Sequence, residues 1–422
     1  MLTRTRSRPA QRTSEEWFAN TVIGCHADAY VQYLAGRGYA AETITGYFRS
    51  TAHFVHWFAR QRVDAATELS EKLIDRFLDQ HLPHCRCAPR CWRTRAEVRP
   101  ALKHLLEMLR AKGVCPKRTL AVPDRIAAEL ADFDRHLADV RGLAACTRAV
   151  RLRHVLDFLT ASAGTGPITL TALAPADVVR FVTRRTAGLA PGSIKAVGTS
   201  LRSYFLFRAT RRKQTRALIV AIPRVAQWRL AGLPQTLSAP EIQRLLNAFD
   251  RRTATGQRDY AITRCLLDLG LRRMEVAHLR LEDVDWRAGV LRIHGKGKRI
   301  DVLPLPKATG RAIAKYLQSG RPPTTRRELF VRHRPPVNAP ANLDVVRNAV
   351  RYAAARCGLE RRIRGTHIFR YTMARRLMQG GARFKEIADL LRHRSLDTTT
   401  IYAKVDLQAL ARVALPWPGS QT

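Results

Sequence analysis

Hydrophobic residues recur with the period of an α-helix along most of this chain. In the segment EKLIDRFLDQHL from Glu71, and in PALKHLLEMLRAKG from Pro100, apolar positions follow one another at spacings of three and four residues. Such spacings place the apolar side chains on one face of a helix. Similar segments begin at Ala176 and Gly192. The pattern therefore predicts a mainly helical protein.

A weak internal repeat divides the N-terminal half of the chain. The runs from Ala29 and from Asp132 each combine an apolar helix, a turn that contains glycine, and a basic helix that starts at threonine. Further helices of similar pattern follow each run. We therefore expect two small helical modules, at 20–115 and 125–215, with a proline-containing linker at 216–237.

The pattern changes after Ser238, which is placed to cap a helix that has Pro240 near its start. In GVLRIHGKGKRIDVLPLP from Gly289, apolar and polar residues alternate on both sides of a turn rich in glycine. Alternation around such a turn is typical of a β-hairpin. Because helical periodicity then resumes, we expect a mixed α+β domain over 238–406 and a C-terminal tail at 407–422.

The chain is strongly basic. Its 422 residues include 74 Lys and Arg against 34 Asp and Glu, a formal net charge of +40. The excess is spread over all predicted domains, which favours a nucleic acid over a membrane surface as the partner. Residues 1–19 are expected to be a basic, flexible arm, and they lack the apolar core of a secretory signal. No apolar run reaches the ~20 residues of a membrane span, so we expect a cytoplasmic, nucleoid-associated protein.

Two basic residues occupy unusual positions in the C-terminal half. Arg272 follows Gly270 at the predicted start of a short helix, where the helix dipole favours an anion instead of a cation. Lys296 lies between two glycines at the hairpin tip, where backbone and ammonium can approach an anion closely. Either residue alone also fits an ordinary surface position.

The segment near the C-terminus contributes four more polar candidates. His367 and Arg370 lie three residues apart and therefore on one face of a predicted helix. His393 ends the next predicted helix, and Tyr402 follows shortly after it. A solvated arginine, a helix-capping histidine and a core tyrosine would each be unremarkable alone. Their joint occurrence favours a shared phosphate-binding site.

Residues 238–406 resemble the catalytic domain of the tyrosine recombinase (phage integrase) family. GLRRMEVAHLRLEDVD is similar to the first arginine box of that family, GKGK to its hairpin lysine, HIFRY to its His-x-x-Arg box, and LLRHRSLDTTTIY to its histidine and nucleophile segment. The module at 125–215 resembles the core-binding domain. The resemblance implies two helical N-terminal DNA-binding modules of the SAM-like core-binding type, and a mixed α+β catalytic domain with a small β-hairpin or sheet.

Three positions depart from the pattern of the family without removing a catalytic group. Tyr371 stands where a histidine often follows the box arginine, and Phe369 replaces a leucine. Arg392 occupies the place of the usual glycine before His393, where it could alter the backbone or add a phosphate contact. The additional module at 20–115 is also unusual.

The resemblance implies the role of each site residue. Tyr402 is the expected nucleophile, which would form a 3′-phosphotyrosyl ester and so conserve the energy of the DNA phosphodiester. Glu275 is expected to orient Arg272. The expected catalytic set is Arg272, Lys296, His367, Arg370, His393 and Tyr402. Because its cations take the part that divalent metals play in nucleases, no cofactor is expected.

The function implied is that of a site-specific DNA recombinase or integrase, an enzyme of DNA transposition by a mobile element. Its expected partners are double-stranded DNA and other recombinase subunits, either in a homotetramer on DNA or in an assembly with sister recombinases. A relaxing topoisomerase of the IB type and a catalytically silent, sequence-specific DNA-binding protein are the alternatives. The expected DNA-binding residues are Arg49, Arg151, Lys195, Arg202, Arg273, Lys298 and Arg392.

One further cluster combines histidines and cysteines. The stretch HLPHCRCAPRCW offers His81, His84, Cys85, Cys87 and Cys91, which are enough nitrogen and sulfur donors for tetrahedral zinc. However, the spacing of its cysteines is not that of a common zinc finger. The sequence therefore favours a basic loop with reduced thiols, and zinc binding is the alternative.

Overall fold

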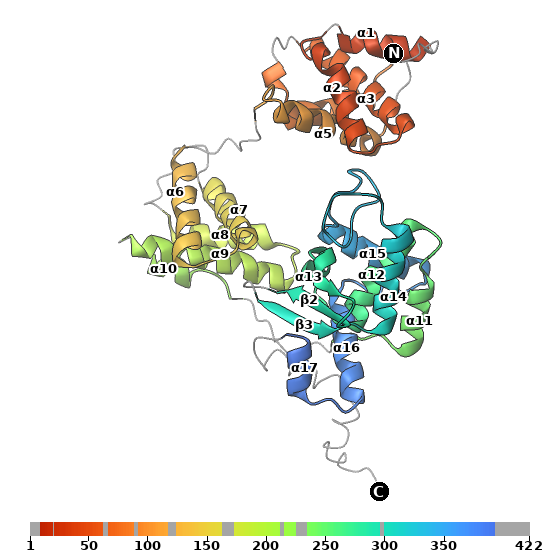
Figure 1. The fold of residues 1–422 in the computed structure, drawn as a ribbon. Coiled ribbons are helices and arrows are strands. Elements are labelled where there is room, and N and C mark those ends of the chain that lie inside the picture. Colours follow the sequence, from red (N-terminus) through yellow and green to blue (C-terminus); the bar gives the residue numbers. More distant parts are fainter. Residues whose placement is uncertain are drawn as a thin grey trace, which may run out of the picture. The chain divides into compact units, whose positions relative to one another are not determined.

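The computed structural model is dominated by helices, which confirms the predicted fold class (Figure 1). It describes residues 9–19, 21–61, 66–87, 92–116, 124–162, 173–211, 215–224, 234–295 and 299–392. Five candidate residues lie outside these ranges, namely Cys91, Lys296, Lys298, His393 and Tyr402. Among the described helices, none is long and apolar enough to cross a membrane. The chain divides into two compact units, residues 117–232 and the remainder.

Five α-helices build the N-terminal part of the chain. They are α1 (Pro9–Ala19), α2 (Ala27–Gly36), α3 (Ala41–Ala59), α4 (Glu71–Arg76) and α5 (Arg95–Ala111), with short helical turns η1 (Gly24–His26), η2 (Ala66–Glu68) and η3 (Phe77–His81). Helix α3 packs against α1 and α5. Its apolar run buries Phe54 and Phe58 completely, and Leu102 and Leu105 of α5 complete the same core.

Residues 117–232 form a second helical unit with its own core. Its elements are α6 (Asp124–Arg135), η4 (His136–Val140), α7 (Ala145–Ser162), α8 (Pro175–Thr186), α9 (Pro191–Thr210) and α10 (Arg216–Val220). Helix α9 contacts α7, α8 and α10. Leu201, Tyr204 and Phe205 of this helix are completely buried, together with Phe133 and Phe158. The apolar face of α9 therefore organises the unit.

The described residues of the C-terminal part, from 234 to 392, contain seven α-helices and the sheet. The elements are α11 (Ala239–Asn247), α12 (Ala254–Asp268), α13 (Arg273–Ala277), η5 (Leu281–Asp283), β1 (Val284–Asp285), β2 (Val290–His294), β3 (Ile300–Pro304), α14 (Lys307–Lys315), η6 (Tyr316–Gly320), α15 (Leu343–Arg356), α16 (His367–Gln379) and α17 (Phe384–Leu390). Ser238 caps α11 as predicted, because its Oγ accepts a hydrogen bond from the Glu241 N–H at 3.4 Å.

The predicted β-hairpin is present as strands β2 and β3, and β1 extends it to a three-stranded antiparallel sheet. Leu291 pairs with Leu303, and both are buried, as is Ile293. Ile300 and Val302 point to the other face and are exposed. This alternation fixes the register of the hairpin, since a slip by one residue would exchange its two faces.

Helix α12 connects the core of this part to the candidate site. It packs against α14, α15 and α16, and its residues Ile262 and Leu266 are completely buried. The helix ends before Gly270, whose φ of 57° lies in the left-handed region that glycine adopts without steric cost. This turn leads directly to Arg272. Figure 1 shows α16 and α17 following one another at the C-terminal end of the described chain.

Replacing Gly270 by alanine is expected to destabilise the protein more than the same change at Gly289. Both residues have positive φ, 57° and 65°, so each alanine costs about 1–2 kcal/mol in backbone strain. At Gly270 the new Cβ would also lie 2.7 Å from Leu391 Cδ2 and 2.8 Å from Met373 Sδ, whereas nothing lies within 4 Å at Gly289. This overpacking adds about 1–3 kcal/mol. Urea unfolding checks the difference, and equal losses at the two positions would refute it.

Candidate active site

Arg272 is held in place by Glu275 at the start of α13. Its backbone N–H donates to Glu275 Oε2 at 2.8 Å, and its Nη1 donates to Glu275 Oε1, also at 2.8 Å. One carboxylate therefore fixes both the backbone and the side chain of Arg272. The side chain of Arg272 still has a relative exposure of 40%. It is oriented by protein and remains accessible to a ligand, as a phosphate-binding arginine requires.

Arg392 approaches the same carboxylate from the end of α17. Its Nη2 donates to Glu275 Oε2 at 2.6 Å, and its side chain is only 6% exposed. Its backbone carbonyl accepts a hydrogen bond from Arg272 Nη2 at 3.3 Å. The guanidinium predicted to contact DNA is therefore engaged with Glu275. A phosphate contact by Arg392 stays a prediction.

Glu275 is buried, yet the environment favours its charged form. Burial alone would raise the pKa of Glu275, but the positive charge of Arg392 and the hydrogen bonds from Arg272 outweigh it. The net pKa consequently lies below the ordinary value for glutamate. At neutral pH the carboxylate is ionised and forms ion pairs with both arginines.

Arg370 is joined to the turn that precedes Arg272. It lies on α16 and is buried, and its Nη1 donates to the carbonyl oxygen of Gly270 at 2.7 Å. This bond links residues that are 100 positions apart in the sequence. The two predicted arginines of the site are thus connected through one short turn at the end of α12.

His367 is the first residue of α16, one helical turn before Arg370. Its pKa lies below the ordinary histidine value, because the surrounding protein desolvates the ring and because Arg370, Arg272 and Arg273 place positive charge near it. The imidazole is therefore neutral at pH 7 and can accept a proton or a hydrogen bond. The described residues of the site thus include Arg272, Glu275, His367, Arg370 and Arg392.

The remaining predicted catalytic residues, Lys296, His393 and Tyr402, lie outside the described part of the chain. The flanking structure is described on both sides of Lys296, where His294 ends β2 and pairs with Ile300 of β3. The neighbour of His393 is Arg392, which is bound to Glu275. The predicted roles of these three residues stay predictions.

Three of the predicted DNA-binding residues lie on two packed helices of residues 117–232. Lys195 and Arg202 are two turns apart on α9, and hence on one face of that helix. Arg151 on α7 donates from Nη1 to Ser203 Oγ at 2.8 Å, which brings it next to Arg202. Of the others, Arg49 lies on α3 and Arg273 begins α13. Their contacts with DNA stay predictions.

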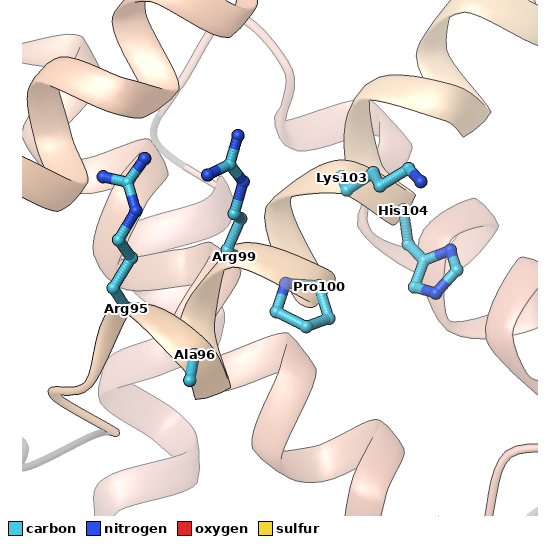
Figure 2. A pocket seen from close by; sticks show the side chains of 6 residues that line it. All are labelled: Arg95, Ala96, Arg99, Pro100, Lys103 and His104. Atoms are coloured by element: carbon cyan, nitrogen blue, oxygen red, sulfur yellow. The ribbon is translucent and has the colours of Figure 1, made fainter. Parts of the chain in front are cut away.

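A different basic surface follows α5 of the N-terminal part. A hollow lies along this helix, and Figure 2 shows the side chains of Arg95, Arg99 and Lys103, which line it. These cations already have acidic partners. Arg95 pairs with Asp75 at 2.8 Å and with Asp79, Arg99 with Asp75 at 3.6 Å, and Lys103 with Glu107 at 3.7 Å. A row of charges that is neutralised in this way is a weak site for a phosphate backbone.

The histidine and cysteine cluster differs from the one expected from the sequence. His81, Cys85 and Cys87 do lie together, but their fourth neighbour is His53 of α3. His84 is exposed and does not belong to the group, and Cys91 lies outside the described residues. His53 was not among the metal ligands predicted from the sequence. The signal available was a histidine inside the apolar run HFVHWF, since a buried histidine needs a polar partner.

Comparison with known proteins yields one family. The model of the phage integrase family matches residues 235–409. The y4rA protein of Sinorhizobium fredii, which carries the name integrase/recombinase, is 36% identical over 392 residues, or 92% of this chain and 93% of the relative. The tyrosine recombinase XerD of Listeria monocytogenes is 29% identical over 65% of this chain and 93% of its own length.

Solved structures show the same fold. The XerH site-specific recombinase in a post-cleavage complex with difH DNA superposes with a TM-score of 0.54 at 19% identity, over 68% of this chain and 84% of that one. A dimer of lambda integrase residues 75–356 on a core site superposes with a TM-score of 0.52 at 16% identity, over 65% of this chain and 94% of that one.

Changing Glu275 to glutamine is expected to destabilise the protein by about 3 kcal/mol, because the change removes the nearer counter-charge of the buried Arg392 guanidinium and leaves it with Asp301, whose Oδ2 lies 3.9 Å from Arg392 Nε. Free energies of unfolding from urea titration measure the loss. Glu282→Gln is the matched control, since Glu282 also pairs with two arginines, Arg280 at 3.0 Å and Arg327 at 3.4 Å, but at the surface. The control should change stability little. Similar small losses in both variants would contradict the role of Glu275.

Proposed function

This chain belongs to the phage integrase family of tyrosine recombinases, enzymes that cleave and rejoin DNA, and from that premise we propose that it recombines double-stranded DNA at specific sites through a 3′-phosphotyrosyl intermediate. The observation that carries the proposal is the network of Arg272, Glu275 and Arg370. This network brings both arginines to the turn at Gly270 and leaves the side chain of Arg272 partly exposed, so that a ligand can reach it. A phosphodiester is the ligand that this pair of cations suits.

The first chemical step is attack by the Tyr402 hydroxyl on a DNA phosphorus. The bond between phosphorus and the 5′ oxygen breaks, and a bond between phosphorus and the tyrosine oxygen forms. A free tyrosine has a pKa near ~10, so little phenolate exists at neutral pH. The positive field of Arg272, Arg370 and His393 favours loss of the phenolic proton and stabilises the attacking oxygen.

Arg272 and Arg370 are assigned the role of stabilising the negative charge of the transition state. Charge accumulates on the non-bridging phosphate oxygens during attack, and a guanidinium can donate two parallel hydrogen bonds to them. The Glu275 carboxylate accepts a hydrogen bond from Arg272, and the Gly270 carbonyl accepts one from Arg370. Because both groups are oriented before DNA binds, little reorganisation remains for the reaction itself.

Proton transfer is assigned to Lys296 and His367. The leaving 5′ oxygen needs a proton, which Lys296 supplies from the tip of the hairpin as general acid. The neutral imidazole of His367 accepts a proton or a hydrogen bond next to the phosphate. In the rejoining step the roles reverse, because a 5′ hydroxyl of the new partner strand attacks the phosphotyrosine and releases Tyr402.

The rest of the protein is assigned to DNA binding and assembly. The basic residues of α7 and α9, Arg151, Lys195 and Arg202, contact the phosphate backbone, so affinity falls steeply as salt concentration rises. The tail at 407–422 docks on a neighbouring subunit in a tetramer on DNA, or on a sister recombinase. The integrase name of the y4rA relative supports a role in moving a mobile element.

Tyr402→Phe is expected to abolish covalent capture of DNA. A nicked suicide substrate traps the protein after cleavage, because the short strand that leaves diffuses away and cannot attack the phosphotyrosine. Wild-type protein should form a denaturation-resistant adduct, and Tyr402→Phe should form none while binding DNA with unchanged affinity. Tyr371→Phe is the matched control and should still form the adduct. An adduct with Tyr402→Phe would overturn the assignment of the nucleophile.

Cleavage is expected to need neither a divalent metal nor ATP. The phosphotyrosyl ester conserves the energy of the phosphodiester, and cationic side chains stabilise the negative charge on the phosphate. Adduct formation should proceed at the same rate with Mg²⁺ and with EDTA added together with the substrate. A drop in rate of more than about tenfold, or ~1.4 kcal/mol in barrier height, that Mg²⁺ reverses and Zn²⁺ does not would place a divalent metal in the chemical step. Recombination between two labelled duplexes, run in parallel, separates a recombinase from a topoisomerase that only relaxes supercoils.

A further inference from the structure

A second group of polar side chains converges in the N-terminal part, where the phosphate chemistry does not use it. His53 comes from α3, His81 ends η3, and Cys85 and Cys87 follow in the next segment. The potential ligand atoms of these four residues all lie within 4.8 Å of one another. The two Nε2 atoms are 3.2 Å apart, and Cys87 Sγ is 3.7 Å from His81 Nε2.

The two separations at His81 Nε2 fit edges of a zinc tetrahedron. Zinc binds imidazole nitrogen at about 2.0–2.1 Å and thiolate sulfur at about 2.3 Å, which puts tetrahedral ligands roughly 3.3 Å apart for two nitrogens and roughly 3.6 Å apart for nitrogen and sulfur. The observed distances of 3.2 Å and 3.7 Å lie close to both values. The other separations are at most 4.8 Å, so the donors converge from the remaining distances by side-chain movements of about an ångström when they bind one ion.

The surroundings are those of a structural metal site. His53 has a relative exposure of 1% and Cys85 of 8%. The ring of Phe77 lies edge-on to His53, with centroids 5.1 Å apart, and stacks on His81 at 5.3 Å. Phe77 thus packs against both imidazoles, while His81 and Cys87 are half-buried. With four protein donors, no coordination position is left for a substrate.

A metal-free alternative accounts for only part of this arrangement. Two neutral imidazoles can share one hydrogen bond between their Nε2 atoms, and this would explain the close approach of His53 and His81. It gives no reason for both thiols to converge on the same pair of rings. Two nitrogen and two sulfur donors around one point are the ligand set that selects zinc over harder cations such as Mg²⁺ or Ca²⁺.

We propose that His53, His81, Cys85 and Cys87 bind one structural zinc ion. On binding, the two thiols lose their protons to solvent and the two imidazoles donate neutral lone pairs, so that the charges of Zn²⁺ and two thiolates cancel. The ion joins α3 to the segment that leads into α5. Trp92 of that segment contacts α3 as well, with its ring edge-on to Tyr47 at 5.9 Å. The metal thereby anchors the start of α5.

Metal analysis of the purified full-length protein tests the proposal. Protein prepared under reducing conditions and dialysed against metal-free buffer should retain one zinc ion per chain by mass spectrometry of the metal. His81→Ala and Cys87→Ser should each lose most of it. The matched controls are His84→Ala and Cys146→Ser, which change exposed residues of the same types outside the ligand set and should keep full occupancy.

Cobalt substitution provides a second measurement that does not depend on the variants being folded. Wild-type protein loaded with Co²⁺ should show the visible absorption of a tetrahedral centre and a charge-transfer band from thiolate to cobalt. Three results would overturn the proposal. They are a folded wild-type protein without stoichiometric zinc, an octahedral cobalt spectrum, and loss of zinc in Cys91→Ser while Cys85→Ser retains it. None of these results bears on covalent capture of DNA by Tyr402, so the two proposals fail separately.

Discussion

The candidate site depends on the buried carboxylate of Glu275. It accepts hydrogen bonds from the backbone and side chain of Arg272 and from the side chain of Arg392. A buried charge is tolerated only when it is paired and hydrogen-bonded. Burial of Glu275 therefore depends on both arginines, and burial of Arg392 depends on Glu275. Arg272 and Arg392 are 120 positions apart. The orientation of the first arginine of the site therefore requires that the end of α17 is docked against α13.

Arg392 illustrates how this chain accommodates a departure from the pattern of its family. The residue has a φ of 54°, a conformation natural for the glycine usually found there. For an arginine this backbone costs about 1–2 kcal/mol. A charged hydrogen bond of the kind it makes to Glu275 contributes about 1.5–3 kcal/mol, which offsets the strain. The substitution thus retains the turn and adds a link between α17 and Glu275.

The sequence predicted what local pattern determines and missed what tertiary contacts determine. Helical periodicity, the alternation around Leu291 and Ile293 and the cap at Ser238 all depend on neighbours in the sequence. The pairing of Arg392 with Glu275 has no local signal, and the family resemblance suggested a phosphate contact there instead. His53 was missed for the same reason. It lies in an apolar helix well before the cysteines, so its pattern is that of a core residue.

The cluster around Glu275 and the cluster around His53 both place ionisable groups in the protein interior, and they stabilise these groups by different chemistry. Each joins segments that are distant in the sequence, and each places ionisable groups in a poorly solvated interior. Around Glu275 the charges are compensated by fixed arginines, which suits a site that must also attract a phosphate. Around His53 the imidazoles are neutral, and the charges of two thiolates would cancel that of a bound Zn²⁺ ion. The cluster therefore adds no net charge to the core. Because two thiolates balance the charge of a divalent ion, a metal link there would stabilise the N-terminal core without changing its net charge.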